Sequence, residues 1–200
     1  MSIKEAKKNF IVDVAAGLYL SRGIFTVTIK DVADEAGVGE ATVYRYFSTK
    51  RNLVVAVGEK LATDVRKKSV DPIVEQTGYE KIRAFFMCFS DIYRSRPELY
   101  RFVSDFDVFV QEEEGDLGDY EKSVFDFFLD FSSAYKQGRE DGTVREIENL
   151  DLYYLTTTHA LLGLCKKLAA GRILSQDKYG AEEVETLVDI VLTNIKQTRV

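Results

Sequence analysis

The sequence predicts an all-α protein of about nine helices. Apolar residues recur with helical spacing through nearly all of the 200 residues, and the only prolines are Pro72 and Pro97, which leaves room for long uninterrupted helices. The best strand candidate, TVTI at 26–29, is too short and isolated to build a sheet. Hydrophobic residues make up 46% of the chain and charged residues 30%, so the chain can bury a core and is not disordered.

The first predicted helix spans residues 4–22. Its apolar residues form one stripe along the helix: Phe10, Ile11, Val14, Ala15, Leu18 and Tyr19. Arg22 supplies a basic last turn, and Gly23 follows it as a helix stop. The stripe indicates a helix that packs one side against a core.

Two short helices and a longer one are predicted next. Thr28 and Asp31 have the spacing of a capping box, which opens the first of them. Ser48 and Thr49 provide the cap of the long helix. The three helices are expected over about 28–37, 39–47 and 50–68.

The chain after Asp71 and Pro72 predicts five more helices, separated by connections that contain glycine. Ser95, Pro97 and Glu98 give the second of these a cap, an early proline and an acidic first turn. The expected spans are roughly 79–94, 97–113, 119–140, 150–170 and 181–197.

The composition excludes several classes of protein. No apolar run reaches the roughly 18 residues that span a bilayer, and the N-terminal MSIKEAKKNF is charged where a signal peptide is apolar, so we expect a cytoplasmic protein without a membrane partner. Cys88 and Cys165 match no zinc or redox spacing and are expected to be buried thiols. His159 is the only histidine, and no P-loop, GxSxG or carboxylate–metal spacing occurs, so no catalytic residue, metal site or cofactor is predicted.

Charge is distributed unevenly between the two parts of the chain. Residues 1–70 hold 12 Lys and Arg against 8 Asp and Glu, whereas residues 71–200 hold 15 against 25. A basic head on an acidic body fits a phosphate-binding module joined to a part that avoids phosphates. Chance asymmetry explains the same numbers equally well.

The segment from 28 to 47, TIKDVADEAGVGEATVYRYF, has the spacing of a helix-turn-helix. Glycines bracket a tight turn at 37–39, and small residues before the turn allow two helices to cross closely. The expected packing joins Val32, Ala33 and Ala36 of the first helix to Val43 and Phe47 of the second. The second helix would then display its polar residues outward.

Residues 11–57, including GVGEATVYRYFSTKRNLVVAV, resemble the DNA-binding domain of the TetR/AcrR family of bacterial transcription regulators. The chain length, the helical remainder and QGREDGTVR at 137–145 agree with that family. The resemblance implies a helix-turn-helix DNA-binding domain at 1–50 and a ligand-binding and dimerisation domain at 51–200. It implies a homodimeric repressor that a small apolar or aromatic effector releases from a palindromic operator in double-stranded DNA.

The resemblance also implies a set of DNA-binding residues. They are Lys30 on the second helix, Glu40, Ala41, Thr42 and Tyr44 in the first turns of the recognition helix, Arg45 and Tyr46 toward its end, and Lys50 as a phosphate ligand opening the fourth helix. Glu40 either accepts a hydrogen bond from cytosine or pairs with a Lys or Arg. Tyr44 is expected at the surface, since Val43 and Phe47 already form the inward pair, although an aromatic stripe can be core. Lys50 and Arg51 could instead form a solvated face.

Residues 79–135 are unusually rich in aromatic side chains, which suit a ligand cavity with stacking surfaces. The alternative is that these rings fill the core. His159 shares a helix with Leu152, Leu155 and Leu162 and is either an interface or core residue or a ligand contact. The predicted ligand-binding residues are Phe85, Phe89, Tyr93, Phe102, Phe106, Phe109, Phe128, Phe131 and His159.

The last two predicted helices are apolar on more than one side, so a strip remains after they cover the body. A second copy forming a four-helix bundle would bury that strip and supply the second recognition helix that a palindrome requires. The alternative function is an all-α carrier or enzyme with a structural N-terminal domain. Such a protein has no need for Lys30, Thr42, Tyr44 and Lys50 on one side.

Overall fold

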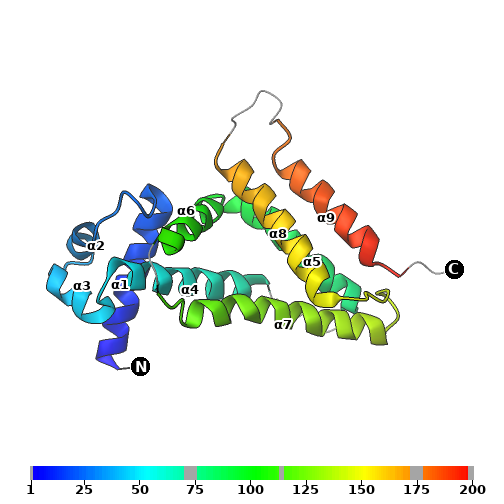
Figure 1. Cartoon of the computed structure of the whole chain (residues 1–200), viewed down its shortest axis with the longest axis horizontal. Helices are drawn as coiled ribbons and strands as arrows, with labels where there is room; N and C mark the ends of the chain where they lie inside the picture. The colour runs from blue at the N-terminus through cyan, green and yellow to red at the C-terminus, as the bar shows by residue number, and fades with distance from the viewer. Residues whose placement is uncertain (1, 70–75, 113–114, 172–177, 198–200) are drawn as a thin grey trace. The chain divides into compact units, whose positions relative to one another are not determined.

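The computed structural model describes residues 2–69, 76–112, 115–171 and 178–197, and these fold into nine helices and no strand (Figure 1). Val144 and Lys196 form an isolated antiparallel bridge. The helices are α1 Ile3–Arg22, α2 Ile29–Glu35, α3 Glu40–Phe47, α4 Lys50–Ser69, α5 Gly78–Ser95, α6 Glu98–Glu112, α7 Asp119–Glu140, α8 Leu150–Ala169 and α9 Ala181–Ile195. The all-α prediction is confirmed. The predicted break at Asp71–Pro72 and the predicted helix end at 113 lie outside the described residues.

Local side-chain caps explain why several helices begin where they do. In α2 the amide of Asp31 donates to Thr28 Oγ1 at 3.1 Å, and the amide of Thr28 donates to the Asp31 carboxylate at 2.7 Å, which completes the predicted capping box. Thr49 Oγ1 likewise accepts from the amide of Asn52 at 3.1 Å and caps α4. The strand candidate at 26–29 is not a strand, because its last two residues are the cap and first residue of α2.

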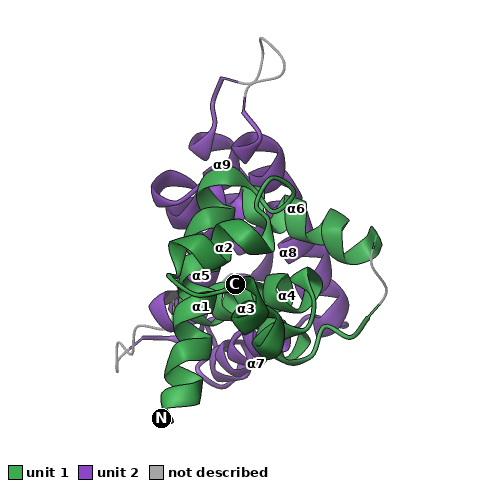
Figure 2. Cartoon of the chain, turned by 90° about the vertical axis from the view of Figure 1, so that its left-hand side faces the viewer, with its two compact units in different colours: residues 1–65, 101–124 green, residues 66–100, 125–200 purple. Residues whose placement is uncertain are grey.

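The chain forms two compact units, which Figure 2 colours separately. The first comprises residues 1–65 and 101–124, and the second comprises 66–100 and 125–200. Helices α4, α6 and α7 each contribute residues to both units. The predicted functional boundary at residue 50 stays a prediction, and the first four turns of α4 pack with the N-terminal helices.

The first unit buries Ile11, Ala15 and Tyr19 of the predicted α1 stripe together with residues of α2, α3 and α4, whereas Phe10 of that stripe is 51% exposed. The largest fully buried side chains of this unit include Tyr19, Ile11, Ile24, Leu53 and Phe106. Arg51 is also buried, so the alternative in which it belongs to a solvated face is wrong. Its guanidinium donates to the carbonyl oxygens of Gly115 and Asp116 at 2.7 and 2.8 Å, which supplies the partners that a buried charge needs.

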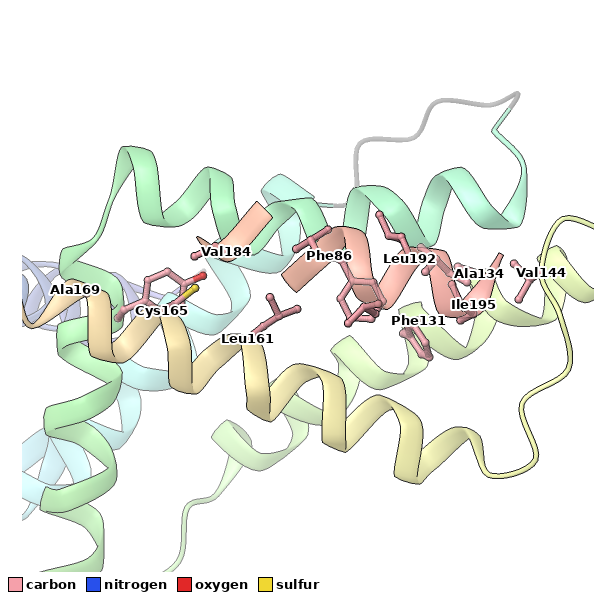
Figure 3. Packing of buried hydrophobic residues seen from close by; sticks show 14 residues of the cluster. Phe86, Phe131, Ala134, Val144, Leu161, Cys165, Ala169, Val184, Leu192 and Ile195 are labelled. Carbon is pink, nitrogen blue, oxygen red and sulfur yellow. The ribbon is translucent and has the colours of Figure 1, made fainter. Parts of the chain in front are cut away.

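The second unit has a core built from α5, α7, α8 and α9 (Figure 3). Phe86, Phe131, Leu161, Val188 and Ile195 are among its fully buried residues, and Figure 3 shows several of these side chains between the helices. The apolar periodicity of α9 is explained by this burial, because its residues repeat every three or four positions on the side that meets α5 and α8.

The segment 137–145 includes the last residues of α7 and packs against the start of α5. Gly78 and Gly138 cross so closely that a Cβ at Gly78 would lie 2.0 Å from the amide nitrogen of Gly138. The carboxylate of Asp141 accepts from the amide of Gly78 at 2.8 Å, and Thr143 Oγ1 accepts from the amide of Tyr79 at 3.2 Å. These bonds satisfy free N–H groups in the first turn of α5, so this segment has a structural role.

The two cysteines differ in their surroundings. Cys165 is buried as predicted, and burial raises the pKa of its thiol to about 11, which keeps it protonated and unreactive. Cys88 is only half-buried. Among the described helices, none combines the length and the apolar character needed to cross a membrane.

Candidate nucleic-acid interface

A tight turn between α2 and α3 sets the geometry of the predicted DNA-binding surface. Gly37 has φ = 63°, in the left-handed region that favours glycine. The amide of Gly37 donates to the Asp34 carbonyl at 3.2 Å, and the amide of Val38 donates to the Ala33 carbonyl at 2.9 Å. This bond pair is a Schellman motif, which ends α2 and redirects the chain into α3 within a few residues.

The inward side of α3 is apolar and fully packed. Val43 is 0% exposed and Phe47 is 4% exposed, and α2 contributes buried Val32 and Ala33 to the same core. The helices α2 and α3 contact each other, as the sequence predicts. Because Val43 and Phe47 lie four residues apart on one side of the helix, the remaining side chains of α3 must point elsewhere.

The outward side of α3 carries the predicted DNA-binding residues. Tyr44 is 47% exposed, as expected for a surface residue. The guanidinium of Arg45 lies 5.5 Å from the ring centroid of Tyr46, so the two side chains form one stacked unit. No ion pair joins Glu40 to any Lys or Arg in the described part of the chain. On α3, Glu40 and Ala41 are exposed and Thr42 is half-buried, and Lys30, which lies on α2, is exposed.

Lys50 lies at a different kind of position from the other predicted residues. Its Nζ donates to the carbonyl oxygen of Ile24 at 2.6 Å and lies 5.4 Å from the ring centroid of Phe109, and the side chain is half-buried. The predicted phosphate contact of Lys50 stays a prediction. Sequence reasoning could not find the internal role, because Ile24 is 26 residues away.

Electrostatic contacts stabilise the start of α2. Hydrogen bonds from Thr28 lower the pKa of the Asp31 carboxyl from its ordinary value to about 2, and the nearby Arg22 guanidinium contributes in the same direction. Arg22 Nη2 lies 3.2 Å from Asp31 Oδ1. The carboxylate is therefore ionised at every pH at which the protein is normally handled.

Three of the predicted ligand-binding aromatics belong to the first unit. Phe102, Phe106 and Phe109 are all buried there. The Phe106 ring lies 4.6 Å from the Tyr120 ring, and a Cβ at Gly58 would lie 2.8 Å from Phe106 Cε2. These three rings fill the core between α4 and α6 within that unit.

The other predicted aromatics belong to the second unit, where α8 adds a member that the sequence prediction missed. The Tyr154 ring lies 5.1 to 6.1 Å from the rings of Phe85, Phe128 and Phe131. Phe131 is fully buried, whereas Phe85, Phe89, Tyr93 and Phe128 are half-buried. The missed signal was the adjacent pair Tyr153–Tyr154, since the prediction considered only the leucines of α8. We call Phe85, Phe128, Phe131 and Tyr154 the α8 ring cluster.

His159 does not join the α8 ring cluster. It is exposed on α8, like Leu152 and Leu155, which are 60% and 47% exposed. Within the described residues, His159 makes no hydrogen bond or ring contact. Of its predicted roles, the surface position suits an interface better than a core position or a contact to a buried ligand.

Comparison with known proteins finds a family match for the N-terminal segment. Residues 11–57 match the sequence model of the family described as "Bacterial regulatory proteins, tetR family". The chain is similar to the HTH-type transcriptional repressor KstR2 of Rhodococcus jostii, with 33% identity over 26% of this chain and 25% of the relative. It is also similar to the HTH-type transcriptional regulator BetI of Agrobacterium fabrum, with 29% identity over 42% of this chain and 41% of the relative. The chain thus spans less than half the length of these relatives.

The fold extends this likeness beyond the N-terminal segment. A solved structure described as a transcriptional regulator from Saccharomonospora viridis in complex with choline has a TM-score of 0.79 to this chain. The superposition covers 97% of this chain and 100% of that one, at 15% sequence identity. At this identity the similarity concerns the fold.

Proposed function

We propose that the chain is a member of the TetR family of bacterial regulatory proteins and acts as a homodimeric DNA-binding repressor of transcription that a small molecule releases from a palindromic operator. The observation that carries the proposal is the division of α3 into two sides. Val43 and Phe47 anchor the helix in the core, while Tyr44 and Arg45 are exposed and Thr42 is half-buried. Hydroxyl, phenol and guanidinium groups are donors and acceptors that suit base edges and phosphates.

A palindromic operator requires two copies of α3, and α8 and α9 offer the surface for a dimer. Leu152 and Leu155 on α8 and Ile190 on α9, which is 61% exposed, are large apolar residues at the surface. The Tyr153 hydroxyl donates to the Val191 carbonyl at 3.0 Å, which brings the first turns of α8 level with α9 near Ile190. We propose that these three residues pack against a second copy, as in a four-helix bundle.

The proposed ligand site is the α8 ring cluster in the second unit. Its half-buried members, Phe85, Phe128 and Tyr154, offer aromatic surface to an apolar or aromatic effector. The similar solved regulator in complex with choline supports the view that this fold holds a small molecule. Since α4 contributes residues to both units, a ligand that favours one tilt of α4 would change DNA affinity at a distance.

The DNA proposal is tested with duplexes from the region flanking the coding gene, by fluorescence anisotropy at rising salt. We expect specific binding that loses on the order of a thousandfold in affinity between about 50 and 200 mM salt, because counterions are released from the phosphates. Binding with a flat salt response would contradict the proposal.

The dimer proposal is tested by light scattering. Leu155→Asp together with Ile190→Asp should convert a dimer into a monomer, because two carboxylates cannot be buried in an apolar strip without partners. Leu129→Asp, the same change at an exposed leucine of α7, is the matched control and should leave the mass unchanged. A monomeric wild-type protein, or a double variant that remains dimeric, would rule out this interface.

A further inference from the structure

The first two turns of α1 carry three exposed lysines on one side. Lys4, Lys7 and Lys8 precede Ile11 and Ala15, which are fully buried. Steps of three and four residues separate positions 4, 8, 11 and 15, so they share one side of the helix. The side of α1 that packs in the core of the first unit therefore continues toward the N-terminus as a basic surface.

One of these lysines shows where that basic surface lies. The ammonium of Lys8 is 5.8 Å from the ring centroid of Phe47, a cation–π contact. Phe47 is the last residue of α3 and is almost fully buried. The basic start of α1 thus adjoins the end of the helix whose outward side carries Tyr44 and Arg45.

No ion pair joins Lys4, Lys7 or Lys8 to a carboxylate within the described residues. Glu5 is the only acidic residue among positions 1–12, and its carboxylate accepts from the amide of Ser2 at 2.9 Å in the capping box of α1. Asp13 lies 3.2 Å from Lys60 Nζ, on α4. The capping box also keeps the first turn of α1 helical, so the three lysines project from an ordered helix.

We propose that Lys4, Lys7 and Lys8 bind backbone phosphates of DNA alongside the site that α3 contacts. This proposal rests on the proposed function, and it adds a contact surface outside the helix-turn-helix. Flexible ammonium groups suit phosphate oxygens and carry no base information, so this surface would add affinity and fix the orientation of α3 without adding sequence preference.

The test compares the full chain with the variant Lys4→Gln/Lys7→Gln/Lys8→Gln on an operator duplex and a scrambled duplex of equal length. The slope of log affinity against log salt should fall by roughly one unit for each lysine that contacts a phosphate, and affinity should fall by the same factor on both duplexes. A matched control removes three exposed lysines of the second unit, Lys136, Lys178 and Lys196, and should keep the wild-type slope.

The outcomes separate this inference from the proposed function. A triple variant with the wild-type slope would overturn the phosphate surface while leaving the regulator intact. A control variant that loses as much slope as the triple variant would also overturn it, because the effect would then come from total charge. Wild-type protein that binds neither duplex would instead contradict the proposed function itself.

A second variant guards against an effect that comes only from packing. Lys4→Gln/Lys7→Gln keeps the contact between Lys8 and Phe47, and urea unfolding with circular dichroism should show wild-type stability. This double variant should still lose up to roughly two units of slope per protomer. If only the triple variant loses affinity, Lys8 acts by holding α3, and the proposal fails.

Discussion

The Lys50 ammonium and the Ile24 carbonyl oxygen lie 2.6 Å apart and join the first residue of α4 to the connection between α1 and α2. The amide of Ile24 donates in turn to the Asp105 carboxylate at 3.2 Å. The backbone of Ile24 is therefore held on both sides, by Lys50 of α4 and by Asp105 of α6, both within the first unit. Since α2 follows directly, a shift of either helix would disturb the start of the helix-turn-helix.

A DNA-phosphate contact of Lys50, proposed beside its hydrogen bond to Ile24, predicts two separable losses in Lys50→Ala. The variant should lower the free energy of unfolding by about 1.5 kcal/mol, because a hydrogen bond to a charged donor is lost at a half-buried site. It should also lower DNA affinity about equally on all sequences and reduce the salt slope by roughly one unit per protomer. Urea unfolding and salt titration measure the two effects. An unchanged slope beside reduced stability would show that Lys50 only positions Ile24.

The two sides of α3 predict opposite outcomes for adjacent residues. Tyr44→Ala should weaken operator binding while the free energy of unfolding stays within about 0.5 kcal/mol of wild type, because the side chain is half outside the core. Val43→Ala should lower the free energy of unfolding by about 2 kcal/mol, since it leaves a cavity. Urea unfolding and anisotropy distinguish them. A Tyr44→Ala protein that unfolds would mark Tyr44 as core.

Glu40 and Thr42 are predicted to affect sequence preference. Glu40→Gln should change which base pair is preferred at one position of each half-site, by about 1 to 3 kcal/mol, because the amide can donate as well as accept. Selection from a library of operator variants measures this preference. If Glu40→Gln raised affinity uniformly on all sequences, Glu40 would act only through repulsion of phosphates.

The lowered pKa of Asp31 predicts an acid-sensitive contribution to stability. The ordinary value is 3.8 and the folded value is about 2, so the ionised form is favoured by folding. The contribution is complete above about pH 4 and disappears as the pH falls through about 2. The stability difference between wild type and Asp31→Asn in urea should therefore shrink over that range. A difference that stays constant over that range would contradict the assignment.

Two helical glycines predict opposite effects of a single methyl group. At Gly58 a Cβ would lie 2.8 Å from Phe106 and 3.3 Å from Tyr120, so Gly58→Ala should destabilise by about 1 to 3 kcal/mol through overpacking. At Gly17 in α1 nothing lies within 4 Å, so Gly17→Ala should stabilise by about 0.5 to 1 kcal/mol. Thermal or urea unfolding gives both values. Equal effects at the two sites would contradict the packing of Phe106 on α4.

The aromatic residues of the two units predict different phenotypes. Phe128→Ala should reduce the binding of an apolar fluorescent probe such as anilinonaphthalene sulfonate more than it reduces operator affinity. Phe106→Ala, in the buried core of the first unit, should instead lower the free energy of unfolding by about 3 to 5 kcal/mol. Titrations of the probe and of the operator with both variants, together with urea unfolding, distinguish the two phenotypes. If Phe128→Ala impaired only operator binding, the proposed ligand site would be misplaced.

The sequence by itself determined the helices, their caps and the two sides of α3. Thr28 and Asp31 are three residues apart, and Val43 and Phe47 are four apart, so their bonds and contacts follow from the geometry of one helix. The exposed surface of α3 could be predicted for the same reason. Such features depend on neighbours within one or two turns, and the pattern of residues records them.

Only the tertiary structure decided which core each aromatic enters and what the basic residues bind. Phe106 packs on Gly58, and Tyr154 of α8 packs against Phe128 of α7. Arg51 can be buried because two carbonyl oxygens 64 and 65 residues away accept hydrogen bonds from its guanidinium. The contact between the Lys8 ammonium and the Phe47 ring likewise depends on the tertiary structure. The energy of these contacts depends on which helix faces pack together in the folded chain. Helical periodicity indicates that a face is apolar, but it does not indicate which other face packs against it.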